Sequence, residues 1–263
     1  MFRTLFAAAV TLAGFSVGTR EVVRTGTGAE DEYRFSRELR SGQTLAVSNI
    51  EGNITVSRTS GRTATVVVTK KVVRGDGDLV KAILEETDDG IKVCTVYLAT
   101  ADEDRTRCRG TSSGSHRNLD VEMTYEVRLP NGVRLDASNV DGDLRVEGAD
   151  TPGRISTVDG DIHYAGVMPD RLNTVDGDVM LDVTGAVPDG ARISTVDGSI
   201  TITLPASAAL DLRASTIDGD LESEFPLTVR GKWGPRTLEG AINGGGPSLR
   251  LSTVDGSITI RRR

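Results

Sequence analysis

The chain has 263 residues, with Lys+Arg 31 against Asp+Glu 38 and a formal net charge of −7. This acidic balance argues against a nucleic-acid-binding protein, which needs a basic surface to displace phosphate counterions, and the 2 His and 2 Cys are too few for a conventional multi-ligand zinc site. The 30 Gly and the aromatic content of only 4% are typical of a folded chain with many strands and tight turns.

Residues 1–18 have the pattern of an export signal. Arg3 supplies a positive start, residues 5–17 form an uncharged and mostly apolar run, and the final Ser-Val-Gly offers a small-x-small cleavage site. The apolar run is too short to span a bilayer comfortably, so we expect no transmembrane anchor in the mature chain. The sequence therefore predicts an exported protein in the periplasm, at the cell surface or in the medium. A buried N-terminal helix is the alternative.

Residues 19–130 are predicted to form a β-rich N-terminal region. Runs typical of longer strands lie at 63–73, 91–98 and 119–129. Residues 78–86 could form either a short helix or a strand, and little other helix is expected.

Cys94 and Cys108 are the two cysteines of the chain and lie in this N-terminal region. In an oxidising compartment an even cysteine count indicates a bridge, so we expect a Cys94–Cys108 disulfide. A loop of this length would stabilise the fold by roughly 3 kcal/mol. Two unpaired thiols are the alternative.

A repeated motif organises residues 131–263, which we predict to be a separate repeat region. Its common pattern is Thr-Val-Asp-Gly, then Asp or Ser, then an aliphatic residue. The motif glycines, including a degenerate copy around Gly240, are Gly142, Gly160, Gly177, Gly198, Gly219, Gly240 and Gly256, at spacings of 18, 17, 21, 21, 21 and 16. An upstream copy at 42–54 aligns with 132–144 at a constant offset of 90. Periods near 20 residues indicate a stacked repeat architecture.

Each copy has a local physical interpretation. Asp-Gly supplies the positive φ of a tight turn, and the apolar residues on either side, such as Val158 and Ile162, are expected to point to one interior. An antiparallel meander of hairpins and a parallel β-solenoid both satisfy this pattern. The recurrence of one motif favours the solenoid, because stacked coils about 4.8 Å apart place equivalent side chains in ladders.

The predicted signal, the VCTVY strand at 93–97, the second Cys and the serial T-V-D-G-D/S-[IV] units together resemble the bacterial "putative adhesin" family of unknown function. The resemblance covers about residues 30–263. It implies an all-β fold, a right-handed parallel β-solenoid or β-helix-like domain on exported proteins. It implies no catalytic residues and no cofactor.

The acidic residues of the turns are candidate metal ligands if the coils stack. One row would contain Asp141, Asp159, Asp176, Asp197, Asp218, Glu239 and Asp255, and a second would contain Asp143, Asp161, Asp178 and Asp220. Unit charges about 5 Å apart repel by roughly 1 kcal/mol in water, and Ca²⁺ could neutralise them because it binds several carboxylate oxygens. Hydrated Asp side chains at exposed turns are the alternative.

Two features resemble catalytic sites, and both have simpler interpretations. The G-x-S-x-G run at 110–114, followed by His116, lies in a polar stretch without the helix that a nucleophile elbow needs. His163, beside Tyr164 on a predicted strand, is typical of a surface or half-buried histidine. A β-helical polysaccharide-cleaving enzyme should interrupt its repeats with a unique cluster, and the irregular insert at 225–235 is where it would lie.

The sequence therefore predicts an exported, non-catalytic structural or adhesin-like interaction module of the cell envelope. Its rigid core would display the acidic turn row to an envelope or extracellular partner, either a protein or a glycan. The first alternative is a cation-dependent or glycan-binding envelope protein, and the second is a polysaccharide-acting enzyme.

Overall fold

The structure is a computed structural model that describes residues 23–25, 30–100, 107–108, 118–230 and 236–263. The predicted export signal at 1–18, the run at 110–114 and His116 lie outside the described residues. The described residues are almost entirely strands and turns, with one short 3-10 helix, η1 (Gly77–Leu79). Within them, no helix is long and apolar enough to cross a membrane.

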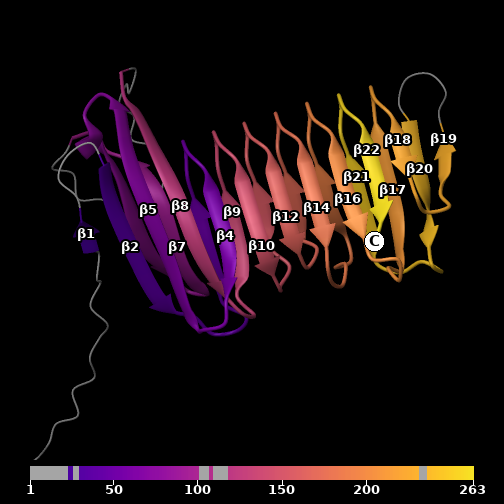
Figure 1. The fold of residues 1–263 in the computed structure, drawn as a ribbon, viewed down its shortest axis with the longest axis horizontal. Coiled ribbons are helices and arrows are strands. Elements are labelled where there is room, and N and C mark those ends of the chain that lie inside the picture. The colour runs from indigo at the N-terminus through magenta and orange to yellow at the C-terminus, as the bar shows by residue number, and fades with distance from the viewer. Residues whose placement is uncertain (1–22, 26–29, 101–106, 109–117, 231–235) are drawn as a thin grey trace, which may run out of the picture.

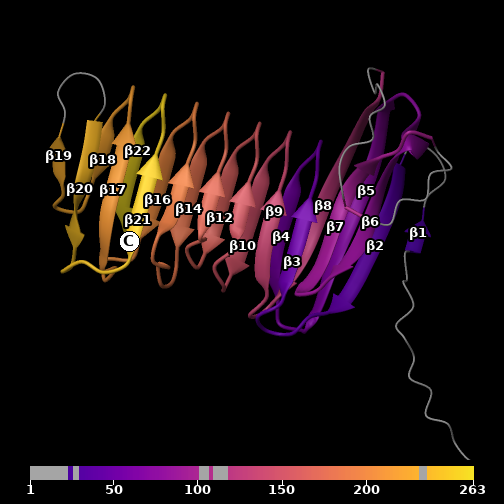
Figure 2. The same cartoon turned by 180° about the vertical axis from the view of Figure 1, so that it is seen from behind.

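The described strands form two sheets that lie face to face along one long axis (Figures 1 and 2). Sheet A contains, in spatial order, β1 (Val23–Thr25), β2 (Glu30–Glu38), β5 (Thr63–Arg74), β8 (Asp120–Pro130), β4 (Ile54–Thr59), β10 (Leu144–Ala149), β12 (Ile162–Gly166), β14 (Val179–Val183), β16 (Ile200–Leu204), β22 (Ile258–Arg262) and β18 (Leu221–Ser223). Sheet B contains, in spatial order, β19 (Thr228–Arg230), β20 (Arg236–Ile242), β17 (Leu210–Thr216), β21 (Ser248–Ser252), β15 (Ala191–Ser194), β13 (Arg171–Asn173), β11 (Arg154–Ser156), β9 (Arg134–Ser138), β3 (Thr44–Ser48), β7 (Gly90–Tyr97) and β6 (Val80–Thr87).

Each regular repeat contributes one strand to each sheet. β11 in sheet B leads through the Asp-Gly turn to β12 in sheet A, and β13 and β14 repeat the same path in the next coil. Equivalent strands pair in parallel, with Ile155 beside Leu172 in sheet B and Ile162 beside Val179 in sheet A. The repeats therefore build the predicted solenoid-like stack with open sheets, and the alternative of an antiparallel meander is wrong for them.

The upstream copy at 42–54 is also a coil of this stack. Leu45 pairs with Leu135 and Ile54 with Leu144, as the constant offset indicates. Beyond this coil, antiparallel pairs extend both sheets, β2 with β5 and β5 with β8 in sheet A and β6 with β7 in sheet B.

The sequence left open whether residues 78–86 form a helix or a strand, and they lie mostly in β6. Buried side chains of both predicted regions belong to one core cluster.

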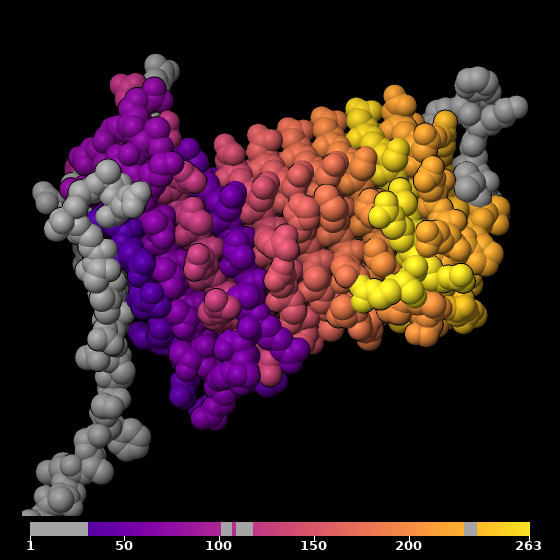
Figure 3. Space-filling view, in the orientation of Figure 1, coloured from indigo at the N-terminus to yellow at the C-terminus, as the bar shows by residue number. Residues whose placement is uncertain are grey.

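The last repeat of the chain is not the last coil of the stack. β21 and β22 lie between the β15–β16 coil and the β17–β18 coil, and their atoms are flanked by earlier residues in the space-filling view (Figure 3). Backbone bridges accordingly join Asp197 to Asp255 and Asp255 to Asp218. Stacking in chain order is therefore wrong at this end. Because nearly identical turns fit against one another in any order, their similarity cannot specify which copies are neighbours.

The degenerate copy around Gly240 is not a turn of the stack. Gly240 lies in β20, which pairs antiparallel with β17 and places Gly240 opposite Leu212 and Glu239 opposite Arg213. The prediction that Glu239 continues the acidic turn row is therefore wrong. β20 instead pairs with β19 on its other side, so this antiparallel pair extends sheet B beyond the last coil.

The repeat turn buries its threonine and exposes its valine. Ile162 has no exposed surface, but Val158 is 44% exposed, so the expectation that both point to the interior is wrong for Val158. The interior position belongs to Thr157, which is buried. Successive side chains of extended backbone point to opposite sides, so an inward threonine places the next residue outward.

The buried threonine hydroxyls connect each turn to the neighbouring coil. Thr195 Oγ1 lies 3.1 Å from the carbonyl oxygen of Gly177 and 3.2 Å from that of Val175, close enough to donate to either. The equivalent contact to a glycine carbonyl of the neighbouring coil is made by Thr157, Thr174, Thr216 and Thr253. The hydroxyls therefore give the glycine carbonyls of the turn a donor, whereas the Val175 carbonyl also accepts the backbone N–H groups of Val196 and Asp197.

The motif glycine is required by the closeness of the coils as well as by its backbone conformation. Gly177 has a φ of 149°, and a Cβ added to it would lie 2.1 Å from the carbonyl oxygen of Gly160. Real Cβ atoms do not approach a backbone oxygen this closely, so any side chain would push the two coils apart.

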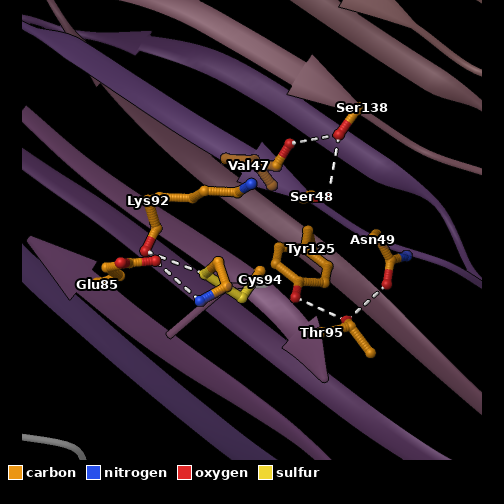
Figure 4. Close-up of a disulfide and its surroundings, with 10 residues drawn as sticks. Val47, Ser48, Asn49, Glu85, Lys92, Cys94, Thr95, Tyr125 and Ser138 are labelled. Carbon is orange, nitrogen blue, oxygen red and sulfur yellow. Dashed lines mark hydrogen bonds between the residues drawn. A yellow bond between two sulfur atoms is a disulfide. The ribbon is translucent and has the colours of Figure 1, made fainter. Parts of the chain in front are cut away.

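A buried polar network and a disulfide occupy the first coil and the strands beside it (Figure 4). Thr95 Oγ1 donates to Asn49 Oδ1 at 2.7 Å and lies 2.8 Å from the hydroxyl of Tyr125. Burial raises the pKa of Tyr125, so this hydroxyl stays protonated and able to hydrogen-bond. The neighbouring residue of β7, Cys94, forms the disulfide with Cys108.

We expect Gly177→Ala to destabilise the protein more than Gly190→Ala. Both glycines have positive φ, where another residue costs about 1–3 kcal/mol, but a Cβ at Gly190 would meet nothing within 4 Å. The free energy of unfolding, measured by chemical denaturation, separates the contact between coils from backbone strain. Asp176→Asn, at the same turn, should have little effect. Equal losses for the two glycine variants would contradict the close contact.

Thr195→Val should lower the free energy of unfolding by about 1–3 kcal/mol, because it keeps the shape of the side chain but leaves the Gly177 carbonyl without its donor. The matched control is Thr201→Val on the outward side of β16, where we expect a change within about 0.5 kcal/mol. Denaturation curves of the two variants test this contrast. Similar losses for both would show that the hydroxyl contact does not hold the turns together.

Candidate functional site

The predicted acidic turn row exists along one edge of the stack, with a changed order and membership. Backbone bridges join the turns in the order Glu51, Asp141, Asp159, Asp176, Asp197, Asp255 and Asp218. The six Asp side chains are exposed. None of these six carboxylates has an ion pair or side-chain hydrogen bond with another residue that the structure describes.

The predicted second row has a structural role in three of its four residues. Asp143 accepts a hydrogen bond from the Asp161 backbone N–H at 3.0 Å, and Asp161 accepts one from that of Asp178 at 2.8 Å. Asp178 continues the series by accepting from Ser199 at 2.8 Å. Asp220 instead forms an ion pair with Arg236. Each of the first three carboxylates therefore joins one coil to the next.

No group of three or more acidic, His or Cys side chains in the described ranges converges on a point that could hold a metal ion. Burial raises the pKa of Glu51, and the negative charge of Asp120 raises it further. Calcium binding by Asp141, Asp159, Asp176, Asp197 and Asp218 stays a prediction.

A second charged row, of opposite sign, lies on the outer face of sheet B, and we call it the arginine face. Paired positions on five adjacent strands all carry arginine, in the spatial order Arg154, Arg171, Arg192, Arg250 and Arg213. All five are exposed, and each is followed by a buried, inward-pointing residue of its strand. Because neighbouring strands are about 4.8 Å apart, the arginines form a straight row across the strands.

The two ends of the arginine face are paired, and its centre is not. Arg154 Nη1 lies 3.8 Å from Asp136 Oδ2 at one end. Arg213 Nη1 lies 3.2 Å from Glu239 Oε2 at the other. The three guanidinium groups at the centre belong to Arg171, Arg192 and Arg250. None of them forms an ion pair or a side-chain hydrogen bond with another residue that the structure describes.

A row of small polar side chains runs beside the arginines, two residues further along each strand. Its members are Ser156, Asn173, Ser194, Ser252 and Ser215. At three of the five strands the two rows line a groove, whose walls include Arg192, Arg250, Arg213, Ser194, Ser252 and Ser215. The groove therefore offers guanidinium groups on one side and hydroxyl groups on the other.

Carboxylates near the central arginines already have partners. Asp170 Oδ2 lies 2.7 Å from Arg134 Nη1. Asp189 accepts hydrogen bonds from the Ser248 backbone N–H and hydroxyl, and these bonds lower the pKa of Asp189. The positive charge of the row is therefore not cancelled by these two neighbours.

The outer face of sheet A differs from the arginine face because its charges are of mixed sign. Arg145 forms an ion pair with Glu147 at 2.6 Å, and Arg263 pairs with Asp182. His163 is a half-buried member of this mixed face, with Met180 on the next strand. A row of arginines with one sign of charge is therefore found on the outer face of sheet B and not on the described outer face of sheet A.

The sequence carries a signal for the arginine face that motif analysis missed. In five copies an arginine lies six residues before the motif glycine, in the pattern R-x-[SN]-T-[VI]-D-G. The acidic turns dominate the charge of the repeats and hide this regularity. Only the parallel register shows that the five positions are neighbours, including Arg250, which lies between Arg192 and Arg213 although it follows both in the chain.

The arginine face has an electrostatic cost that an anion would remove. Two unit charges at the strand spacing repel by roughly 1 kcal/mol in bulk water. The long side chains can spread apart to reduce this repulsion. A carboxylate, sulfate or phosphate group held between neighbouring guanidinium groups would replace repulsion with charge-assisted hydrogen bonds.

Comparison with known proteins identifies the family. The model of the family described as Toastrack DUF4097 matches residues 36–261, and this confirms the resemblance carried by the repeats. A solved structure of a "putative cell adhesion protein" from Clostridium sporogenes is similar, with 11% identity, TM-score 0.47, and 88% of this chain and 100% of that chain covered. A "putative adhesin" from Bacteroides fragilis has 12% identity, TM-score 0.29, and 88% and 97% coverage. No curated protein matches the sequence.

We expect the melting temperature of the protein to rise with added NaCl, because salt screens both like-charge rows over about 8–10 Å. If the acidic turn row binds calcium, millimolar CaCl₂ should raise the melting temperature further than MgCl₂ at the same concentration, and Asp176→Asn should reduce that difference. A melting temperature independent of NaCl would contradict the repulsion. Equal effects of the two divalent salts would remove the calcium proposal.

Proposed function

The chain belongs to the Toastrack DUF4097 family, and on that basis we propose that it is an exported, non-catalytic, adhesin-like interaction module of the cell envelope that binds an anionic partner through its arginine face. One observation carries the proposal, namely the in-register row whose three central arginines lack partners among the described residues. An unpaired row of one sign is costly to the folded state, and a ligand of opposite sign repays that cost.

The proposed mechanism is display by a rigid surface. The close contacts between coils hold the backbone of the arginine face at the strand spacing, so only the arginine side chains need ordering when a partner binds. A fixed backbone reduces the entropy lost on binding, and the row of like charge steers an oppositely charged partner toward the surface. Arginine suits the task because its planar guanidinium group forms two parallel hydrogen bonds with a carboxylate or phosphate.

Two features support export of the protein. The first is the signal-like pattern of residues 1–18. The second is the Cys94–Cys108 disulfide, since structural disulfides persist in oxidising compartments. Fractionation of cells that express a tagged chain tests this part of the proposal, and retention of the full-length chain in the cytoplasm would contradict it.

Binding to immobilised dextran sulfate, a generic polyanion, tests the arginine face directly. We expect the protein to bind at low salt despite its net charge of −7. The combined variant Arg171→Gln, Arg192→Gln and Arg250→Gln should weaken binding by on the order of tenfold per arginine, the equivalent of one charge-assisted hydrogen bond each.

The matched control removes the same charge from exposed arginines elsewhere, with Arg40→Gln, Arg62→Gln and Arg128→Gln. It should bind dextran sulfate nearly as well as the unchanged protein. Equal losses in the two triple variants would show that overall charge, not the row, determines binding. Failure of the unchanged protein to bind at low salt would overturn the proposal.

A further inference from the structure

Each rung of the arginine face offers two kinds of polar group at a fixed separation. A guanidinium group and a hydroxyl or amide group lie two residues apart on the same strand, and both point outward. The five rungs are Arg154 with Ser156, Arg171 with Asn173, Arg192 with Ser194, Arg250 with Ser252, and Arg213 with Ser215. The same pair is therefore repeated along the stack at the strand spacing of about 4.8 Å.

We infer that the ligand of this face is a linear acidic polysaccharide that carries one carboxylate on each sugar, a polyuronate, lying along the stack and across the strands. This inference rests on the proposed function of the arginine face. One pyranose unit of a linear chain is close in length to one strand spacing, so a chain of about five sugars spans the five rungs. Consecutive sugars are turned relative to one another, so the carboxylates on the side that faces the protein meet every second or third arginine, while ring hydroxyls face the row of serines and Asn173.

The chemistry of the two rows matches that of an acidic sugar. A guanidinium group binds a carboxylate through two parallel hydrogen bonds. Serine hydroxyls and the Asn173 amide can both donate to and accept from sugar hydroxyls. A ligand with charge alone, such as polyphosphate, would use the arginines and leave the second row without a function.

The composition of the face favours a glycan over a single-stranded nucleic acid. Proteins that bind single strands stack the bases on aromatic side chains, whereas the outward positions of both rows are Arg, Ser and Asn. The acidic edge also disfavours a membrane surface. A plane of anionic lipids would meet the exposed turn carboxylates such as Asp197 together with the arginines, but a linear polymer touches only the row.

The length of the row predicts the length of polymer it holds. Asp136 lies beyond Arg154 at one end, and Glu239 lies beyond Arg213 at the other. A carboxylate of the ligand would be repelled at either position. The site therefore spans five rungs, and its strongest part is the centre, where the guanidinium groups have no competing partner among the described residues.

Titration calorimetry of the purified protein with galacturonic acid oligomers of two to eight sugars tests the inference. We expect affinity to rise steeply up to about five sugars and little beyond, because each further rung adds contacts until the row ends. Oligomers with methyl-esterified carboxylates should bind at least tenfold more weakly, since they lose the charge-assisted hydrogen bonds.

A second variant separates recognition of the sugar from attraction of charge. Ser194→Ala, Ser252→Ala and Ser215→Ala, combined, keep every arginine and should weaken binding of the pentamer while leaving binding of dextran sulfate nearly unchanged. The matched control is Thr201→Ala, Thr203→Ala and Thr259→Ala on the outer face of sheet A, which should change neither.

The outcomes distinguish this inference from the proposed function. Dextran sulfate, polyphosphate or single-stranded DNA could bind at least as tightly as the pentamer, with all binding lost in the triple arginine variant. This result would overturn the inference of a polyuronate ligand but leave the proposal that the arginine face binds anions. Pentamer affinity that does not depend on length, or that survives the serine variant, would also overturn the inference. Absence of binding to every polyanion would overturn both.

Discussion

The fold depends on how closely neighbouring coils approach at the repeat turn. A glycine without a side chain lets its turn lie against the carbonyl oxygen of the neighbouring glycine, and a buried threonine hydroxyl reaches such a carbonyl from the next coil. At Thr195 and Gly177 this contact is 3.1 Å long. Both features permit only one alignment of the two strands, so the register of the whole stack follows from a short contact repeated at every turn. The same register then places every outward side chain beside its equivalent.

Such stacking concentrates charge as effectively as it aligns apolar side chains. The turn carboxylates collect along one edge, while arginines collect on the outer face of sheet B, and neither row is visible in a net charge of −7. In three turns the acidic residue after the glycine behaves differently, because Asp143, Asp161 and Asp178 each accept a backbone hydrogen bond from the next coil. Two acidic residues two positions apart, such as Asp159 and Asp161, thus serve different purposes, one exposed and the other holding the coils together. The arginine row has no comparable structural use at its centre, and this is why a ligand explains it better than stability does.

Both ends of the stack depart from the repeat. Antiparallel strands extend the sheets beyond the first coil and beyond β17, where the chain no longer supplies a matching turn. The C-terminal coil is inserted between two others, so that Ile193 pairs with Leu251, and Leu251 in turn with Ala214. The arginine row is completed by this insertion, because Arg250 fills the position between Arg192 and Arg213. The arginine face therefore depends on contacts between residues far apart in the chain, which the last strands of the protein supply.

The sequence alone determined the class of fold and most of its local chemistry. The 90-residue offset identified residues 42–54 as a further copy of the repeat, and the strand pairing shows that this copy lies beside 132–144, with Leu45 next to Leu135. Asp-Gly specified the turns for a local reason, the conformational freedom of glycine. Tertiary structure decided the rest. Val158 points outward, against expectation, and Thr157 inward, because the threonine hydroxyl finds its acceptor on another coil. The order of the last coils depends on strand pairing that near-identical motifs leave open. The arginine face belongs to this second group: each arginine is present in the sequence, but its neighbours are set by hydrogen bonds between strands that are far apart in the chain.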